Sequence, residues 1–142
     1  DSAYIYYDKF VRARESGGLD IYPQEDIKIG LVYQKQGLGE QAEGLYRSYD
    51  RYCERDASIY KSASTAVKFA REGQYDAAIA QLKAFSRQDN IQYWMLLFME
   101  LDPHMEPLKS HRDYPEVIRA IQDRFWENHR VLRHKLQEQG LL

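Results

Sequence analysis

Two stretches of the chain repeat one pattern of aromatic, small and large residues. In each stretch an aromatic residue lies four positions before a glycine, an alanine lies five positions after it, and a large residue follows four positions later. The first set is Tyr33, Gly37, Ala42 and Tyr46, and the second is Phe69, Gly73, Ala78 and Leu82. The two glycines are 36 positions apart. A self-similarity of this period predicts stacked helix–turn–helix units and an all-α chain.

Small residues recur at matching places in the two stretches. Gly30 and Ala42 belong to the first, and Ala66 and Ala78 to the second. We expect the two helices of each hairpin to cross closely at these positions, because large side chains there would hold the helices apart. The two repeated glycines are expected to end the first helix of each pair in a left-handed conformation.

The arrangement resembles the tetratricopeptide repeat. The residues that carry the likeness are Tyr33 to Tyr46 and Phe69 to Ala78, and it covers about Pro23 to Gln92. The chain departs from the repeat pattern at Asp26 and Ser62, where the family usually has Trp or Leu. The resemblance implies a right-handed α-α superhelix of antiparallel helix pairs, and a long helix is expected to cap its C-terminal end.

We expect a single helical domain over residues 1–142. Its parts are an N-terminal helix and connector (1–22), a first repeat (23–56), a second repeat (57–90), and a degenerate third repeat with the C-terminal helix (91–142). The expected helices cover residues 3–14, 23–36, 40–55, 58–72, 75–87, 91–101 and 113–139. Ser58 is expected to cap the fourth helix, and Asp113, with Glu116 in a capping box, the last.

The resemblance also implies a binding face. In repeat folds of this family the first helix of each pair lines a concave surface, which here would present Gln24, Ile27, Leu31, Gln34, Lys35, Tyr60, Val67 and Arg71. Lys35 and Arg71 hold matching positions in the two repeats. One hypothesis is that they bind the carboxylates of an acidic peptide, and the alternative is that they are solvated ends of surface helices.

Charge and composition argue against some classes of partner and location. The formal net charge is −2 with no long run of one sign, which argues against direct binding of nucleic acid. No apolar run approaches the roughly 18 residues of a membrane span, so we expect no membrane insertion. Cys53 is the only cysteine and cannot form an internal disulfide, which favours a cytoplasmic location; a periplasmic one suits a membrane-anchored parent protein. Because the sequence starts at Asp1, we interpret it as a piece of a longer protein.

No motif in the sequence indicates catalysis or metal binding. The four histidines are His104, His111, His129 and His134, and none forms the i, i+4 pair on one helical face that metal binding favours. Cys53 lies between Tyr52 and Glu54, which would not activate a thiolate. We therefore expect no enzyme activity, no metal and no cofactor.

One short segment adds context. The stretch from Leu101 to Ile118 looks like the closing segment of repeat domains in bacterial multidomain regulators, which implies a regulatory setting.

We expect a protein–protein interaction module that binds a peptide or protein, and Trp126 is a candidate contact residue because it lies off the apolar stripe of the last helix. The alternative is a dimerisation or spacer domain that acts through its N- and C-terminal helices, and a third possibility is a ligand sensor.

Overall fold

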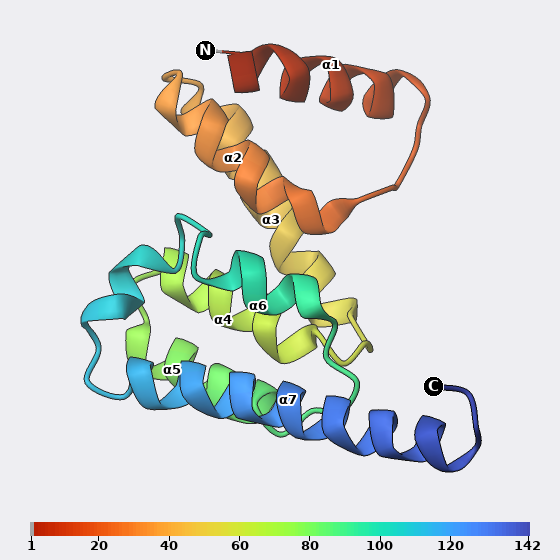
Figure 1. Ribbon diagram of the computed structural model, residues 1–142. Helices are drawn as coiled ribbons and strands as arrows, with labels where there is room; N and C mark the ends of the chain where they lie inside the picture. The colour runs from red at the N-terminus through yellow and green to blue at the C-terminus, as the bar shows by residue number, and fades with distance from the viewer. Residues whose placement is uncertain (1) are drawn as a thin grey trace. The chain divides into compact units, whose positions relative to one another are not determined.

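The protein is all-α. The structure, a computed structural model, describes residues 2–142 apart from the side chain of Phe98, and Asp1, where the expected N-terminal segment begins, lies outside the described residues. The described residues form seven α-helices and no strand (Figure 1), which confirms the predicted class and the long C-terminal helix. The helices are α1 (Ser2–Ser16), α2 (Asp26–Lys35), α3 (Gly39–Arg55), α4 (Lys61–Arg71), α5 (Tyr75–Phe85), α6 (Tyr93–Met99) and α7 (Tyr114–Glu138). Short 3-10 helices cover Pro23–Glu25 and Glu106–Ser110.

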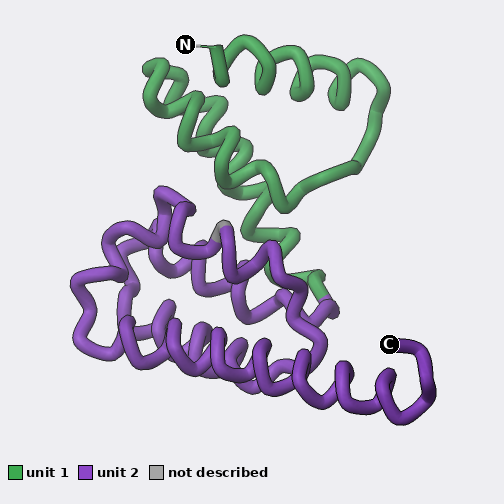
Figure 2. The backbone as a smooth tube through the Cα atoms, in the orientation of Figure 1, with its two compact units in different colours: residues 1–56 green, residues 57–142 purple. Residues whose placement is uncertain are grey.

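The chain divides into two compact units. Unit 1 is Asp1–Asp56 and contains α1 to α3, and unit 2 is Ala57–Leu142 and contains α4 to α7 (Figure 2). Each unit is built around one helical hairpin, α2 with α3 in unit 1 and α4 with α5 in unit 2.

The turns of the two hairpins are the same. At each one, the glycine N–H donates to the carbonyl three positions back, and the next N–H donates to the carbonyl five positions back. The four distances are 3.0 and 3.0 Å at Gly37 and Leu38, and 3.1 and 2.9 Å at Gly73 and Gln74. Both glycines are left-handed, with φ of 78° and 74°. This geometry satisfies carbonyls at the helix end and favours glycine, as the sequence predicts.

The first hairpin closes over a glycine. A Cβ built on Gly30 would lie 2.5 Å from Cε1 of the Tyr46 ring, which is closer than real Cβ contacts. Tyr46 is buried, and its hydroxyl donates to Oε1 of Gln34 at 2.9 Å. Ala42, Ala66 and Ala78 are also buried, as expected for positions where helices approach closely.

The substitution Gly30→Ala tests this close approach. We expect it to lower the free energy of unfolding by about 1–3 kcal/mol, because the new methyl group would overlap the Tyr46 ring. Chemical unfolding followed by far-ultraviolet circular dichroism measures the change. Gly44 in α3 is the matched control: an added Cβ there meets no atom within 4 Å, so Gly44→Ala should stabilise α3 by about 0.5–1 kcal/mol. A Gly30→Ala protein as stable as wild type would contradict the packing described.

A buried ion pair connects α1 to α2. Nη1 of Arg14 lies 2.7 Å from Oδ1 of Asp26, and their side chains are 13% and 0% exposed. Oδ2 of Asp26 has no hydrogen-bond partner among the described residues. The position that departs from the repeat pattern therefore holds a buried carboxylate, and the preceding helix supplies its cation.

Removing one member of this pair should be far more costly than removing both. Arg14→Met leaves the Asp26 carboxylate buried without its cation, and we expect a loss of about 3–5 kcal/mol in the free energy of unfolding. Adding Asp26→Leu removes the buried charge and should restore most of that loss. Urea unfolding of both variants measures the difference. If Arg14→Met alone is harmless, the pair does not hold α1 in place.

Two expected helix caps are wrong. Asp113 makes no capping hydrogen bond at the start of α7. Its carboxylate instead accepts a bond from Nζ of Lys83 on α5 at 2.7 Å, and this bond holds the pKa of Asp113 below its ordinary value. Ser58 lies outside α4, which begins at Lys61, and its hydroxyl accepts from the N–H of Tyr60 at 3.2 Å. Asp113 therefore bonds to a side chain of another helix, and Ser58 bonds to a backbone N–H that precedes α4.

Candidate interaction surface

Helix α6 is apolar on both of its faces. Its seven residues are Tyr-Trp-Met-Leu-Leu-Phe-Met, without a charged side chain among them. One face, with Met95 and Leu96, packs against the core of unit 2, where Phe85 and Ile121 are fully buried. The opposite face carries large side chains with exposed fractions of 47–72%, namely Tyr93, Trp94, Leu97 and, just beyond the helix, Leu101. A helix that is apolar all round is normally covered on every side.

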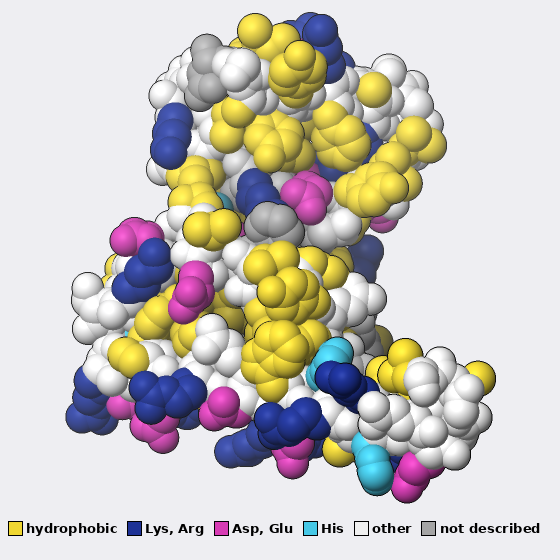
Figure 3. Space-filling model, in the orientation of Figure 1, with side chains coloured by type: hydrophobic (Ala, Val, Ile, Leu, Met, Phe, Trp, Pro, Cys, Tyr) yellow, Lys and Arg dark blue, Asp and Glu magenta, His cyan; other side chains and the backbone are white. Residues whose placement is uncertain are grey.

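Aromatic contacts join this outer face to α7 and to the core. The ring of Tyr93 lies 5.6 Å from Phe125 and 6.1 Å from Trp126, and Trp126 is 46% exposed. The ring of Trp94 lies 5.6 Å from that of Tyr60, which in turn contacts the buried Phe85. We call Tyr93, Trp94, Leu97, Leu101 and Trp126 the aromatic surface. Figure 3 shows hydrophobic side chains gathered over α6, with histidine and basic side chains beside them along α7.

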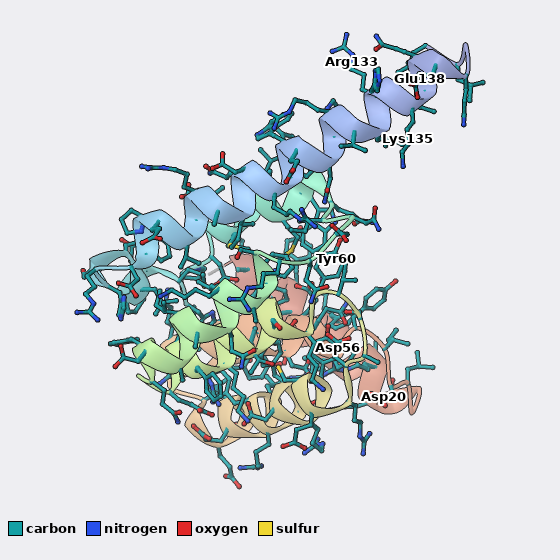
Figure 4. The ribbon with its side chains drawn as sticks, turned by 90° about the horizontal axis from the view of Figure 1, so that it is seen from below. Asp20, Asp56, Tyr60, Arg133, Lys135 and Glu138 are labelled. Carbon is teal, nitrogen blue, oxygen red and sulfur yellow. The ribbon has the colours of Figure 1, made fainter. Side chains whose placement is uncertain are left out.

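The last turns of α7 follow Phe125 and Trp126 along the helix. We call residues 128–138 the α7 extension. Most of its side chains are exposed, including Leu132 at 57%, whereas Leu136 is half-buried. Figure 4 shows Arg133 and Lys135 pointing to opposite sides of this end of the helix. At the start of the extension Asn128 donates to Asp89 and His129 stacks on Phe125, whereas the side chains of residues 129–135 are all exposed.

The sequence-predicted site residues are divided between the two units. Gln24, Ile27, Leu31, Gln34 and Lys35 belong to unit 1, and Tyr60, Val67 and Arg71 to unit 2. Ile27 is 2% exposed, so its side chain is part of the core and is not available to a partner. Gln34 and Lys35 are exposed, and Leu31 is half-buried. The concave groove would need residues from both units, and it stays a prediction.

Three of these residues also have structural contacts. Gln34 accepts the hydrogen bond from Tyr46, and Arg71 pairs with its neighbour Glu72 at 3.3 Å. The hydroxyl of Tyr60 accepts from the N–H of Gln92 at 3.2 Å, which anchors the start of α6. Tyr60 therefore supports the aromatic surface from below.

A cleft of about 680 Å³ lies within unit 1, between α1 and the α2–α3 hairpin. Its side chains are mixed, with Val11 and Leu45 beside polar groups. The hydroxyl of Tyr33 donates to Asp8 at 3.2 Å, and Asp8 also pairs with Arg12 at 2.7 Å. Burial, with a further contribution from Asp8, raises the pKa of Tyr33 to about 12. Because these groups bind one another, we interpret the network as a structural link between α1 and α2.

Each of the four histidines contacts a different residue, and no two of them share a partner. Nδ1 of His104 lies 3.1 Å from Asp102, Nε2 of His111 lies 3.0 Å from Asp76, and Nε2 of His134 lies 3.2 Å from Glu138. The His129 ring stacks on Phe125 at a centroid distance of 6.3 Å. Among residues 2–142, no three His, Cys, Asp or Glu side chains are grouped so that they could hold a metal ion.

Comparisons with known proteins suggest no function for this chain. No protein-family model, curated protein or solved structure matches this chain. None of the described helices has the length and apolar character needed to cross a membrane. The aromatic surface is therefore the strongest candidate site on physical grounds.

Sequence reasoning found only part of this surface. Trp126 was singled out because it lies off the apolar stripe of α7, and it is half exposed beside Tyr93. The outer face of α6 was missed. Its signal is present in the sequence, because seven consecutive apolar residues give a helix two apolar faces, and each face needs to be covered by the core or by a partner.

Exposed and buried members of unit 2 should respond differently to substitution. We expect Leu101→Ser and Leu132→Ser to change the free energy of unfolding by no more than about 0.5 kcal/mol, because both side chains face solvent. Phe85→Ala should cost about 3–5 kcal/mol, because that ring is fully buried. Thermal and chemical unfolding measure all three. A large loss from Leu101→Ser would mean that this residue belongs to the core.

Proposed function

We propose that the chain is a non-enzymatic protein–protein interaction module whose aromatic surface binds an apolar helical segment of another protein. The observation that carries the proposal is the uncovered outer face of α6, which presents three large apolar side chains and continues into Leu101 and Trp126. Aromatic residues, tryptophan and tyrosine above all, dominate the energetics of protein interfaces. Trp94 packs on Tyr60 and Tyr93 packs on Phe125, so these two side chains lose little conformational freedom on binding.

The scaffold proposed for this module is a tetratricopeptide-like stack. Two features support it. The turns at Gly37 and Gly73 use the same hydrogen bonds and the same backbone conformation. The small residues at matching places, Gly30, Ala66 and Ala78, are buried where helices of a hairpin meet. The proposal includes a regulatory role within a larger bacterial signalling or transcription protein, as the segment from Leu101 to Ile118 implies.

A helix suits the surface better than an extended peptide. Tyr93 and Leu97 lie four positions apart on α6, with Leu101 in the turn after the helix, and Leu132 and Leu136 lie four positions apart on α7. Residues with this spacing form stripes along the helix, and a partner helix meets such stripes with its own residues at three- and four-residue spacing. The mode of recognition is therefore an amphipathic helix laid against apolar stripes.

Dimerisation is the second candidate function. The exposed Val131 and Leu132 on the α7 extension favour it, because a second copy of α7 would cover them. Size-exclusion chromatography with light scattering distinguishes the two. A stable dimer that Leu132→Glu converts to a monomer would support self-association in place of a separate partner.

Peptide binding tests the proposed function. The probe is a hydrocarbon-stapled amphipathic helix with a leucine-rich face and only glutamine on its other face, so that it carries no charge. The two tryptophans of the chain, Trp94 and Trp126, both belong to the aromatic surface, and their fluorescence reports binding directly. We expect saturable binding with a shift of tryptophan emission, and at least a tenfold weaker affinity for Leu97→Glu, because a charge there would be buried without a partner.

The matched control for Leu97→Glu is Ile5→Glu. Ile5 is an exposed aliphatic residue on α1, 52% accessible and outside the aromatic surface. The control should bind the peptide as wild type does. Equal loss in both variants, or no binding of the peptide at all, would count against the aromatic surface as a docking site.

A further inference from the structure

Positive charge borders the leucines of the α7 extension on both sides. On a helix with 3.6 residues per turn, Leu132 and Leu136 follow Phe125 along one stripe. Arg133 lies to one side of this stripe and Lys135 to the other, as Figure 4 shows for the two labelled cations. Arg130 lies on the side of Trp126, four positions after it. The extension is therefore an apolar stripe with cations along both edges.

These cations have no partners in the described part of the chain. Arg130, Arg133 and Lys135 form no ion pair there, although Arg124 on the same helix pairs with both Asp89 and Glu127. Glu138 is the one carboxylate side chain of the extension, and it lies 3.2 Å from His134. The chain as a whole has a net charge of −2, so the positive charge of the extension is opposite in sign to that of the whole chain.

We propose that the partner helix is acidic over the part that covers the α7 extension. This inference rests on the proposed function, since it names the class of partner for the same surface. The apolar face of that helix packs on the aromatic surface and on Leu132 and Leu136. Its Glu or Asp residues, placed at the two edges of that face, pair with Arg133 and Lys135.

Two other occupants fit the charges less well. A second copy of the extension would bring three cations of each copy together, with only Glu138 to balance them. An anionic membrane would meet the exposed acidic residues Glu100, Asp123 and Glu127, which lie next to Leu101 and Trp126. A helix with its acidic residues confined to one end avoids both conflicts.

Three stapled peptides with one shared apolar face test the charge of the partner. They differ only in the residues that flank this face toward one end, which are glutamate, glutamine or lysine. We expect the glutamate peptide to bind about tenfold more tightly than the glutamine peptide, as two or three partly exposed ion pairs would give, and the lysine peptide to bind more weakly than either. The advantage of glutamate should shrink as salt is raised.

Charge reversal on the protein locates the effect. Arg133→Glu should remove most of the difference in affinity between the glutamate and glutamine peptides. The affinity for the glutamine peptide should stay unchanged. The matched control is Arg119→Glu, an exposed arginine on the same helix four turns from Arg133, which should keep the difference. An equal loss in both variants would overturn a local role for the extension.

The outcomes separate this inference from the proposed function. Equal binding of the glutamate and glutamine peptides would overturn the acidic partner and leave the aromatic surface as a docking site. No binding of any peptide would overturn both. Binding to phosphatidylserine vesicles that Arg133→Glu abolishes, without selectivity among the peptides, would assign the extension to a membrane surface instead.

Discussion

The structure depends on how closely two helices approach at Gly30. The Tyr46 ring occupies the space where a Cβ would otherwise stand, so this ring of α3 packs directly on the α2 backbone at that point. Ala66 and Ala78 are buried at the matching places in the α4–α5 hairpin. Close packing at a few small residues sets how a hairpin closes, and the closed hairpins present the surfaces to which α1, α6 and α7 attach.

The attachments differ in chemistry. Helix α1 is held by the buried pair of Arg14 and Asp26 and by the contact of Tyr33 with Asp8. Helix α6 is held by apolar packing and by aromatic contacts to Tyr60 and Phe125. The core of unit 2 covers only one face of this apolar helix, and the uncovered second face is what makes unit 2 a candidate for binding.

Sequence periodicity predicted the helices and the turns because those features depend on local spacing. The glycines at 37 and 73 and the small residue at 30 could be placed from their offsets alone. Features that depend on distant residues could not. Asp113 bonds to Lys83, thirty positions away, in preference to its own helix end. Asp26 departs from the repeat pattern in the sequence, and its role becomes clear only from its ion pair with Arg14 on another helix. The exposure of α6 likewise depends on which of its side chains the rest of unit 2 covers.

The proposed partner is a helix that lies on the outer face of α6. The most direct measurement is a nuclear magnetic resonance titration of the labelled protein with the glutamate-flanked peptide, followed through backbone amide and tryptophan indole signals. We expect the largest shifts on Tyr93 to Leu101 and on Phe125 to Leu136, including both indole N–H signals. Shifts confined to α2 and α4, with both indole signals unmoved, would contradict it.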